Sequence, residues 1–214
     1  RSKFSQVLDR LHIMQPAWQA FTSITDAKNF ALEVGYPVLV RPSYVLSGAA
    51  MKTVWSQVEL KKFVTDATTV SPDHPVVITK FMLNALEVDV DGVCDGKNVI
   101  IGAIVEHIDS AGVHSGDAMM CIPPWRLSNK IIENIIDSTT RIATEFSIKG
   151  PFNLQFLIKN DQAYVIELNI RASRSMPFVS KFIRMNLISL ASQATLGKTL
   201  PKMTQNLWMN TGLY

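Results

Sequence analysis

The chain has 214 residues, 47% of them hydrophobic and 18% charged, which is the balance of a globular protein and not of a disordered chain or a fibre. Its net charge is +3, from 21 basic and 18 acidic residues without a long basic run, so we expect an anionic small substrate and no nucleic-acid partner. No stretch reaches the roughly 18 apolar residues of a membrane span, and no membrane association is expected. Cys94 and Cys121 lie outside any CxxC pair, which favours two reduced thiols in a cytosol-like compartment.

The first 75 residues or so predict a small lobe of mixed helices and strands. Apolar residues at helical spacing mark a short helix that ends near residue 12 and a second one over about 25–34, which Gly35 terminates. A buried strand is predicted over 36–41, followed by a loop of small residues. Ser56 and Glu59 then form a capping box that begins a third helix.

The rest of the chain predicts an antiparallel sheet with covering helices. Strands are expected over 75–81, 87–93 and 98–107, and Asp95-Gly96 is a hairpin signal between the last two. A polar loop covers 109–117, and Ser128 begins a long amphipathic helix. Two strands over 152–159 and 162–169 and a closing helix over 187–196 complete an α+β chain.

The last strand pair carries the candidate chemistry. Apolar positions alternate with Gln155 on the first strand and with Glu167 and Asn169 on the second, so one face collects oxygen donors of the kind that magnesium prefers. A three-residue loop over 160–162 places Gln155 opposite Glu167, whereas a two-residue turn places Gln155 opposite Ile166. We therefore predict the odd-length loop. The alternative is that these side chains are only the wet face of an amphipathic hairpin.

Two arginines, Arg171 and Arg174, follow this hairpin directly. Arginines beside a carboxylate cluster suit an anion that metal ions bridge, which is the arrangement of phosphoryl transfer. Elsewhere, His107 at the end of an apolar strand fits a structural role and a ligand contact equally well. Asp89 and Asp91 alternate with valines, and a polar strand face is favoured over a metal pair.

These residues match a known signature, because Glu167-Leu168-Asn169-Ile170-Arg171 fits the ExNxR motif of ATP-grasp enzymes. The wider context resembles the carbamoyl phosphate synthetase large chain and its multifunctional eukaryotic relatives. The resemblance runs almost end to end and is closest to the second of the two ATP-grasp halves. It is carried by Arg41-Pro42-Ser43-Tyr44-Val45-Leu46-Ser47-Gly48, Ala111-Gly112-Val113-His114-Ser115-Gly116-Asp117, Asn169-Ile170-Arg171-Ala172-Ser173-Arg174-Ser175 and Pro177-Phe178-Val179-Ser180-Lys181. Two positions depart from the family pattern: Met176 replaces a residue that is more often aromatic or branched, and Arg184-Met185-Asn186 stands where relatives carry a glycine-centred turn.

The resemblance implies an ATP-grasp fold of two lobes whose antiparallel sheets clasp the nucleotide. Residues 1–79 would form a small lobe with a phosphate lid at 47–51, residues 80–200 a large lobe with the metal and acceptor site, and residues 201–214 an extension. ATP contacts are implied for Arg41, Lys80, Met82, Glu87, Gly112, Val113, His114, Ser115, Gln155 and Glu167. Metal ligands are implied at Gln155, Glu167 and Asn169, and catalytic roles for Asn169, Arg171 and Arg174.

The implied reaction is phosphorylation of carbamate by ATP with Mg²⁺ or Mn²⁺, with K⁺ as a further candidate cation. The implied partners are the other domains of a pyrimidine- or arginine-pathway synthetase, including a bicarbonate-phosphorylating half and a glutaminase as ammonia source. The expected location is cytoplasmic, or mitochondrial for an ammonia-dependent parent. Two alternatives remain: another ATP-grasp carboxylate–amine ligase, and a nucleotide-binding regulatory segment without turnover.

Overall fold

The structure is a computed structural model that describes residues 2–42, 51–70, 75–112 and 117–203. The chain divides into two compact units, Arg1–Leu83 and Asn84–Tyr214. Each unit has its own antiparallel sheet. Within the described ranges, none of the helices has both the length and the apolar character that crossing a membrane requires.

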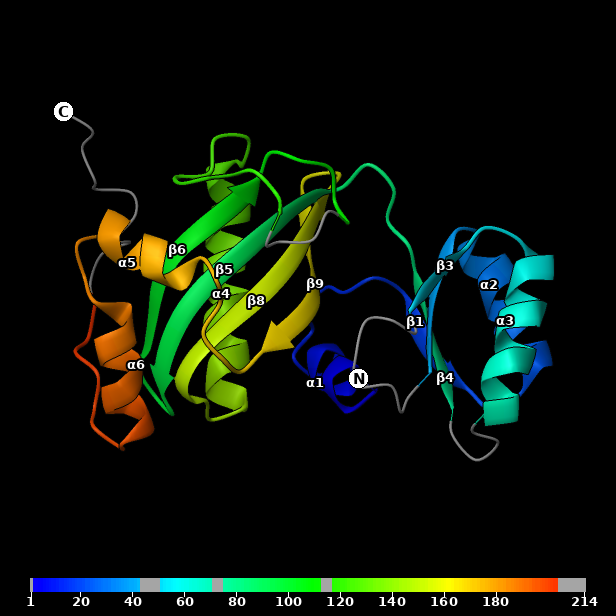
Figure 1. Cartoon of the computed structure of the whole chain (residues 1–214), viewed down its shortest axis with the longest axis horizontal. Coiled ribbons are helices and arrows are strands. Elements are labelled where there is room, and N and C mark those ends of the chain that lie inside the picture. Colours follow the sequence, from blue (N-terminus) through cyan, green and yellow to red (C-terminus); the bar gives the residue numbers. More distant parts are fainter. Residues whose placement is uncertain (1, 43–50, 71–74, 113–116, 204–214) are drawn as a thin grey trace. The chain divides into compact units, whose positions relative to one another are not determined.

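The smaller unit has a four-stranded sheet in the order β1-β4-β2-β3. Its strands are β1 (Trp18–Phe21), β2 (Val38–Pro42), β3 (Lys52–Val54) and β4 (Val76–Lys80), and its helices are α1 (Ser2–Arg10), α2 (Ile24–Val34) and α3 (Gln57–Val70). Helices α2 and α3 lie side by side against the sheet (Figure 1). The core between them is formed by Phe21, Ala27, Ala31, Val38, Val40, Val54, Leu60, Val64, Val76 and Ile78.

Local signals in the sequence determine where the helices of this unit begin and end. The hydroxyl of Ser23 accepts a hydrogen bond from the Asp26 amide at the start of α2, and Gly35 ends the helix with a φ of 76°. At α3 the predicted capping box is present, since the Glu59 amide donates to Ser56 Oγ. The Glu59 carboxylate accepts from the Trp55 amide, one residue earlier than the simplest version of the motif.

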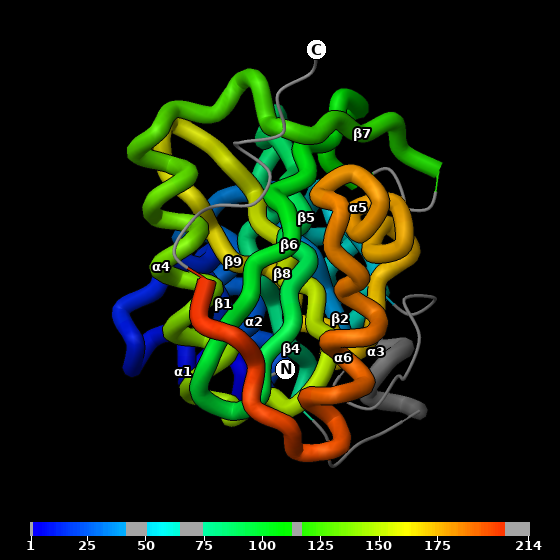
Figure 2. Tube along the Cα trace, turned by 90° about the vertical axis from the view of Figure 1, so that its left-hand side faces the viewer, coloured from blue at the N-terminus to red at the C-terminus, as the bar shows by residue number. Residues whose placement is uncertain are grey.

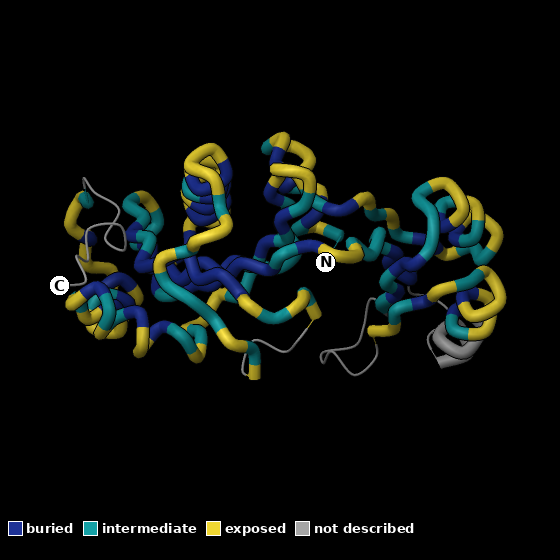
Figure 3. Tube along the Cα trace, turned by 90° about the horizontal axis from the view of Figure 1, so that it is seen from above, coloured by how far each residue is buried: buried dark blue, intermediate teal, exposed yellow. Residues whose placement is uncertain are grey.

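The larger unit has a five-stranded sheet in the order β7-β6-β5-β8-β9. The strands are β5 (Leu86–Asp95), β6 (Val99–His107), β7 (Met120–Cys121), β8 (Lys149–Lys159) and β9 (Gln162–Asn169). Helix α4 (Asn129–Glu145) lies on one side of the sheet, and α5 (Met176–Phe182) and α6 (Leu187–Thr195) lie on the other (Figure 2). Buried strands run through the middle of this unit, and the outer faces of its helices are exposed (Figure 3).

The two faces of the larger sheet differ in chemistry because side chains alternate along each strand. Val88 and Val90 share a face with their strand partners Phe156 and Leu154, and all four are fully buried. Cys94, on the same side of β5, lies beside the Ala143 carbonyl of α4, which identifies this face as the one that α4 covers. The opposite face carries the polar side chains of the candidate site.

The loop between β8 and β9 differs from the predicted three-residue loop. Lys159 pairs with Gln162, so the turn has two residues, Asn160 and Asp161, with φ values of 51° and 56°. Positive φ at both central residues is the geometry of a type I′ turn. The strand register then shifts between Gln155 and Phe156, which pair with Glu167 and Val165. Ile166 is therefore an extra residue in a β-bulge, and the bulge brings Gln155 opposite Glu167 as the sequence predicts, by a different route.

Candidate functional site

Two polar rows cross three neighbouring strands on the face of the larger sheet that is opposite α4. In the first row, Asp89 of β5 pairs with Gln155 of β8, which pairs with Glu167 of β9. In the second row, Asp91, Asn153 and Asn169 occupy the corresponding positions. Paired residues point to the same face with Cβ atoms roughly 5 Å apart, so six polar side chains form one continuous patch.

A cavity of about 100 Å³ is lined by residues of both rows. It brings together four of the predicted residues, Gln155, Asn169, Arg171 and Arg174. Glu167 is half-buried directly across from Gln155, and its charge is close enough to act on Glu87. The remaining residues that line the cavity are Asp89, Met120, Asn153, Ser173 and Ser175. The prediction that the arginines adjoin the oxygen donors therefore agrees with this geometry.

Asp89 and His107 form a buried pair beside this cavity. His107 is fully buried, Asp89 is 3% exposed, and His107 Nε2 lies 3.0 Å from Asp89 Oδ2. Burial favours the neutral ring, but the hydrogen bond and the charge of Asp89 outweigh that effect and raise the pKa of His107. Asp89 and Asp91 lie on a polar strand face, as the sequence predicts, and both carboxyls are buried and hydrogen-bonded there.

Glu87 holds the start of the loop that the sequence assigned to the nucleotide. This side chain is 7% exposed and accepts a hydrogen bond from the Gly112 amide at 3.0 Å. Burial raises the pKa of Glu87, and that hydrogen bond partly opposes the rise. Gly112 has a φ of 99°, which glycine adopts without strain. The other predicted residues of this loop, Val113, His114 and Ser115, lie outside the described residues.

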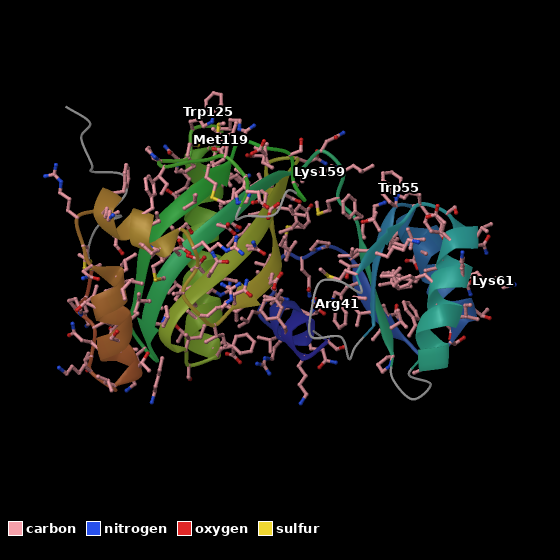
Figure 4. The ribbon with its side chains drawn as sticks, in the orientation of Figure 1. Arg41, Trp55, Lys61, Met119, Trp125 and Lys159 are labelled. Atoms are coloured by element: carbon pink, nitrogen blue, oxygen red, sulfur yellow. The ribbon has the colours of Figure 1, made fainter. Side chains whose placement is uncertain are left out.

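The remaining predicted ATP contacts belong to the smaller unit. Arg41 lies on β2 opposite Val77 (Figure 4), and Met82 is half-buried just after β4. Lys80 ends β4, and its ammonium donates to the carbonyls of Gly35 and Tyr36 at 2.8 and 3.3 Å. The lysine thus stabilises the end of α2. The predicted lid at 47–51 lies outside the described residues apart from Met51.

The donor set fits a magnesium ion that is completed by phosphate oxygens. Gln155, Glu167 and Asn169 offer one carboxylate and two amide oxygens, and all three side chains are half-buried. Asp89 Oδ1 is buried without a hydrogen-bond partner among the described residues, as an acceptor beside a cation site can be. Across the described ranges, no three His, Cys, Asp or Glu side chains come together as a metal-binding group. Magnesium commonly takes one or two carboxylates plus substrate phosphates, so this set is sufficient.

The two departures from the family pattern lie close to the arginines. Met176 begins α5 and is fully buried, so it serves as a packing residue. Arg184 is exposed and has a φ of 56°, the left-handed conformation that glycine adopts without strain.

The sequence analysis missed the residues that support the site, namely Asp91, Asn153, Ser173 and Ser175. Asp91 is fully buried and Asn153 is 4% exposed, and both lie in the second polar row. Burial raises the pKa of Asp91, and hydrogen bonds from the serines and Asn153 oppose the rise. The signal was present in the alternation of Glu87, Asp89 and Asp91 with apolar residues. Only the pairing of β5 with β8 shows that this face adjoins the predicted donors.

The chain has two units, each with an antiparallel sheet, and the larger sheet carries oxygen donors next to a loop with two arginines. These are the features of an ATP-grasp domain. Solved structures share the fold. A biotin carboxylase from Campylobacter jejuni in complex with a β,γ-ATP compound matches 94% of this chain and 46% of that one, with a TM-score of 0.80 and 22% identity. The biotin carboxylase domain of a Hydrogenobacter thermophilus 2-oxoglutarate carboxylase matches 95% of this chain and 46% of that one, with a TM-score of 0.78 and 17% identity.

Sequence comparison narrows the class to one family. The family described as "Carbamoyl-phosphate synthase L chain, ATP binding domain" matches residues 1–203, and the chain belongs to it. The carbamoyl phosphate synthase large chain of Sulfurisphaera tokodaii is 53% identical over 191 residues, which are 89% of this chain and 18% of that protein. The multifunctional protein URA2 of Saccharomyces cerevisiae is 48% identical over 200 residues, which are 94% of this chain and 9% of that protein. The chain thus spans less than a fifth of the length of these relatives.

Proposed function

We propose that this chain transfers the γ-phosphoryl group of MgATP to carbamate, which gives carbamoyl phosphate and ADP. The observation that carries the proposal is the single cavity shared by Gln155, Asn169, Arg171 and Arg174. Family membership and the names of the relatives support the carbamoyl phosphate assignment. The same reaction would make the chain an ATP-dependent ligase domain of a larger synthetase.

The reaction needs no nucleophile from the protein. A carbamate oxygen forms the new bond to the γ-phosphorus while the bond from that phosphorus to the bridging oxygen breaks and ADP leaves. Arg171 and Arg174 stabilise charge on the carbamate and on the transferring group, because guanidinium groups match planar carboxylate and phosphoryl oxygens. Catalysis in this scheme is positioning plus electrostatic stabilisation.

The metal would be held by Gln155, Glu167 and Asn169. When bound, Mg²⁺ neutralises the phosphate oxygens and orients them for in-line transfer. The carboxyl of Asp89 lines the same cavity as Gln155 and Asn169, and that of Glu87 lies two residues earlier on the same strand, so both add oxygen acceptors near the proposed ligands. Mn²⁺ in the same position and K⁺ near Glu87 belong to the proposal as well. The MgADP bound by the 2-oxoglutarate carboxylase domain supports a magnesium nucleotide in this fold.

The nucleotide contacts that the family resemblance implies include residues of each unit. Arg41 would reach the phosphates, Lys80 and Met82 would border the adenine, and residues 112–115 would form a second contact that the Glu87 hydrogen bond helps to hold. In this scheme the unit that ends at Leu83 acts as the small lobe with its lid at 47–51, so the boundary lies four residues later than the predicted 1–79. The large lobe then runs from Asn84 to about residue 200, and residues 201–214 are an extension.

The parent protein would supply what this chain does not. A bicarbonate-phosphorylating half and a glutaminase would provide carbamate, since the relatives are five or more times longer than the matched segment. The proposed setting is a pyrimidine- or arginine-pathway synthetase in the cytoplasm, or in mitochondria for an ammonia-dependent parent.

The test is the reverse partial reaction, in which the chain converts MgADP and carbamoyl phosphate to ATP. ATP formation that requires both compounds is the expected result. ATP turnover with a different carboxylate and an amine, and no reverse reaction, would favour another ligase of this fold. Tight MgATP binding without either activity would favour a regulatory segment, and both of these results contradict the proposal.

A further inference from the structure

The two arginines lie on a loop between the sheet and helix α5. Arg171 and Arg174 are both exposed, and their loop joins the end of β9 to the start of α5. Arg171 donates to the carbonyl of the adjacent Ala172, which fixes the side chain only relative to its own loop. Guanidinium groups that must meet a small anion need a defined position, so the attachment of this loop matters for the proposed chemistry.

Asp91 of β5 attaches this loop to the sheet. Its Oδ2 accepts a hydrogen bond from Ser175 Oγ at 2.6 Å, and its Oδ1 accepts one from Asn153 Nδ2 at 3.1 Å. Ser175 Oγ also lies 3.1 Å from Ser173 Oγ. Ser173 Oγ in turn accepts from the Met176 amide at 3.0 Å. The two serines on either side of Arg174 thus converge on one carboxylate of β5.

A buried carboxyl at this position is unfavourable for stability, which indicates a role beyond packing. Asp91 is fully buried, and its carboxylate has hydroxyl and amide donors but no ion-pair partner within the described residues. Burial of an unpaired carboxylate costs folding free energy, and an apolar residue of similar size would often be more stable there.

We propose that Asp91 is a positioning residue. It orients Arg174, and through the same loop Arg171, toward the cavity that both arginines share with Gln155 and Asn169. Asp91 does not line the cavity, whereas Ser173, Arg174 and Ser175 do, so it acts through the serines and not on the reacting atoms. This inference rests on the proposed function and deepens it. It predicts that loss of the link weakens handling of the transferred group and leaves nucleotide binding unchanged.

The experiment compares Asp91→Asn, Ser175→Ala and the double variant with the unaltered chain in the reverse reaction. We expect each single variant to raise the KM for carbamoyl phosphate by about tenfold or more, since small displacements of a positioning group have effects of this order. The Kd for MgADP, measured by calorimetry, should change by less than about twofold, because the changed residues hold the arginine loop and are not among the proposed nucleotide contacts. The double variant should show no larger KM than the worse single variant, because both changes remove one link.

The control is Glu106→Gln, which alters another fully buried carboxylate. Glu106 accepts from the amides of Trp125 and Arg126 and pairs with the Arg126 side chain, on the opposite face of β6 from His107. If loss of any buried carboxylate disturbs the site, this variant will also raise the KM for carbamoyl phosphate. We expect it to lower stability alone. An unchanged KM in Asp91→Asn, or an equal loss of MgADP affinity, would overturn the proposal.

A second measurement separates failure of the inference from failure of the proposed function. If the unaltered chain forms no ATP in the reverse reaction, the proposed function fails. Hydrogen exchange at the Met176 amide then still tests the anchor, because that amide is bonded to Ser173 Oγ. Exchange should be faster in Asp91→Asn and Ser175→Ala than in Glu106→Gln. Equal exchange in all three variants would mean that Asp91 does not hold the loop.

Discussion

Gln155 and Glu167 lie opposite each other but differ in what they offer a cation. Both side chains provide oxygen, yet only Glu167 brings a full negative charge to the pair. A glutamine in its place keeps the size and one oxygen donor while it removes the charge, so this exchange tests the metal-ligand role with little effect on packing.

Glu167→Gln should lower the rate of ATP formation from MgADP and carbamoyl phosphate by at least about 100-fold, because charge neutralisation by the metal is a large part of phosphoryl transfer. The fold should persist, since Glu167 is half-buried and not part of the core. Steady-state kinetics and circular dichroism would measure the two effects. The matched control is Glu133→Gln, on the exposed side of α4. Undiminished turnover in Glu167→Gln would contradict the ligand role.

Asp95, at the turn between β5 and β6, is a second residue whose charge matters, here for stability. Its carboxylate accepts from the amides of Lys97, Asn98 and Leu200 at 2.9, 2.8 and 2.7 Å. Burial works to raise the pKa of Asp95, but these bonds and the Asn98 side chain outweigh it and hold that pKa well below its usual range. A carboxyl with a lowered pKa stabilises the fold above its unfolded pKa, and the stabilisation is lost as the pH falls toward the folded value.

Asp95→Asn should therefore melt at a lower temperature than the unaltered chain at about pH 7, and the difference should shrink below about pH 4, where the unfolded carboxyl takes up its proton. Thermal unfolding of both proteins across this pH range measures the effect. A difference that does not change with pH would show that the charge of Asp95 contributes nothing and that only its shape matters.

At the scale of elements, the β8–β9 hairpin combines a tight turn with a bulge. Asn160 and Asp161 both adopt positive φ, which asparagine and aspartate tolerate better than β-branched residues. The side chain of Asp161 also accepts from Ser128 Oγ at 3.2 Å and so joins the turn to the start of α4. The turn determines the register of the outer part of the hairpin, and the bulge at Ile166 determines the register of the part that forms the site.

Asn160→Val should lower the free energy of unfolding by about 1–2 kcal/mol, the cost of a left-handed conformation in a residue with a branched side chain. Gln162→Val is the control, because this neighbouring exposed position is in a strand where valine is accepted, and it should stay within about 0.5 kcal/mol. Urea denaturation would measure both. If Asn160→Val costs no more than Gln162→Val, the turn is not of the type I′ form.

The elements that the sequence predicts well are those with long periodic patterns. Strand β5, strand β6 and helix α4 follow from alternation or helical spacing over nine to seventeen residues. Strand β7 has two residues and β1 has four, which is too short for a pattern, and α5 is a seven-residue helix that the sequence does not predict. Strand register is also hard to predict, because a bulge at Ile166 changes the pairing without any signal in local composition.

The candidate site follows the same division. The hairpin donors and the arginines were predicted from one continuous segment, and the cavity brings four of them together. Asp89, Asp91 and His107 come from strands about 50 to 80 residues away along the chain, and only the sheet order β6-β5-β8 places them beside the hairpin. Their burial could not be predicted because it depends on this pairing and on the loop before α5.

At the scale of the whole molecule, two units with separate cores are joined in one chain. The predicted nucleotide contacts are divided between them, with Arg41, Lys80 and Met82 in the first unit and Gln155 and Glu167 in the second. A ligand that binds the native chain should stabilise it by mass action, in proportion to the logarithm of its concentration once that is well above the Kd.

MgATP at about 100 times its Kd should stabilise the chain by about 2.7 kcal/mol, which corresponds to a rise in Tm of roughly 5–10 °C for a chain of this size. Differential scanning fluorimetry with ATP and Mg²⁺, and with ATP and EDTA, would measure the contribution of the metal. The shift should be smaller with EDTA, and in Glu167→Gln it should be smaller with Mg²⁺ present. An identical shift with and without Mg²⁺ would contradict a metal-bridged nucleotide.

The bulge at Ile166 has a consequence for how such a domain can change over evolutionary time. One residue of β9 lies outside the regular pairing. The length of the turn therefore does not by itself decide which face of the sheet Glu167 occupies. A relative could add one residue to the turn and lose the bulge, and its glutamate would still meet the glutamine across the hairpin. A residue gained by the turn can therefore be balanced by loss of the bulge residue. The turn can change in length while the glutamine and the glutamate stay opposite each other.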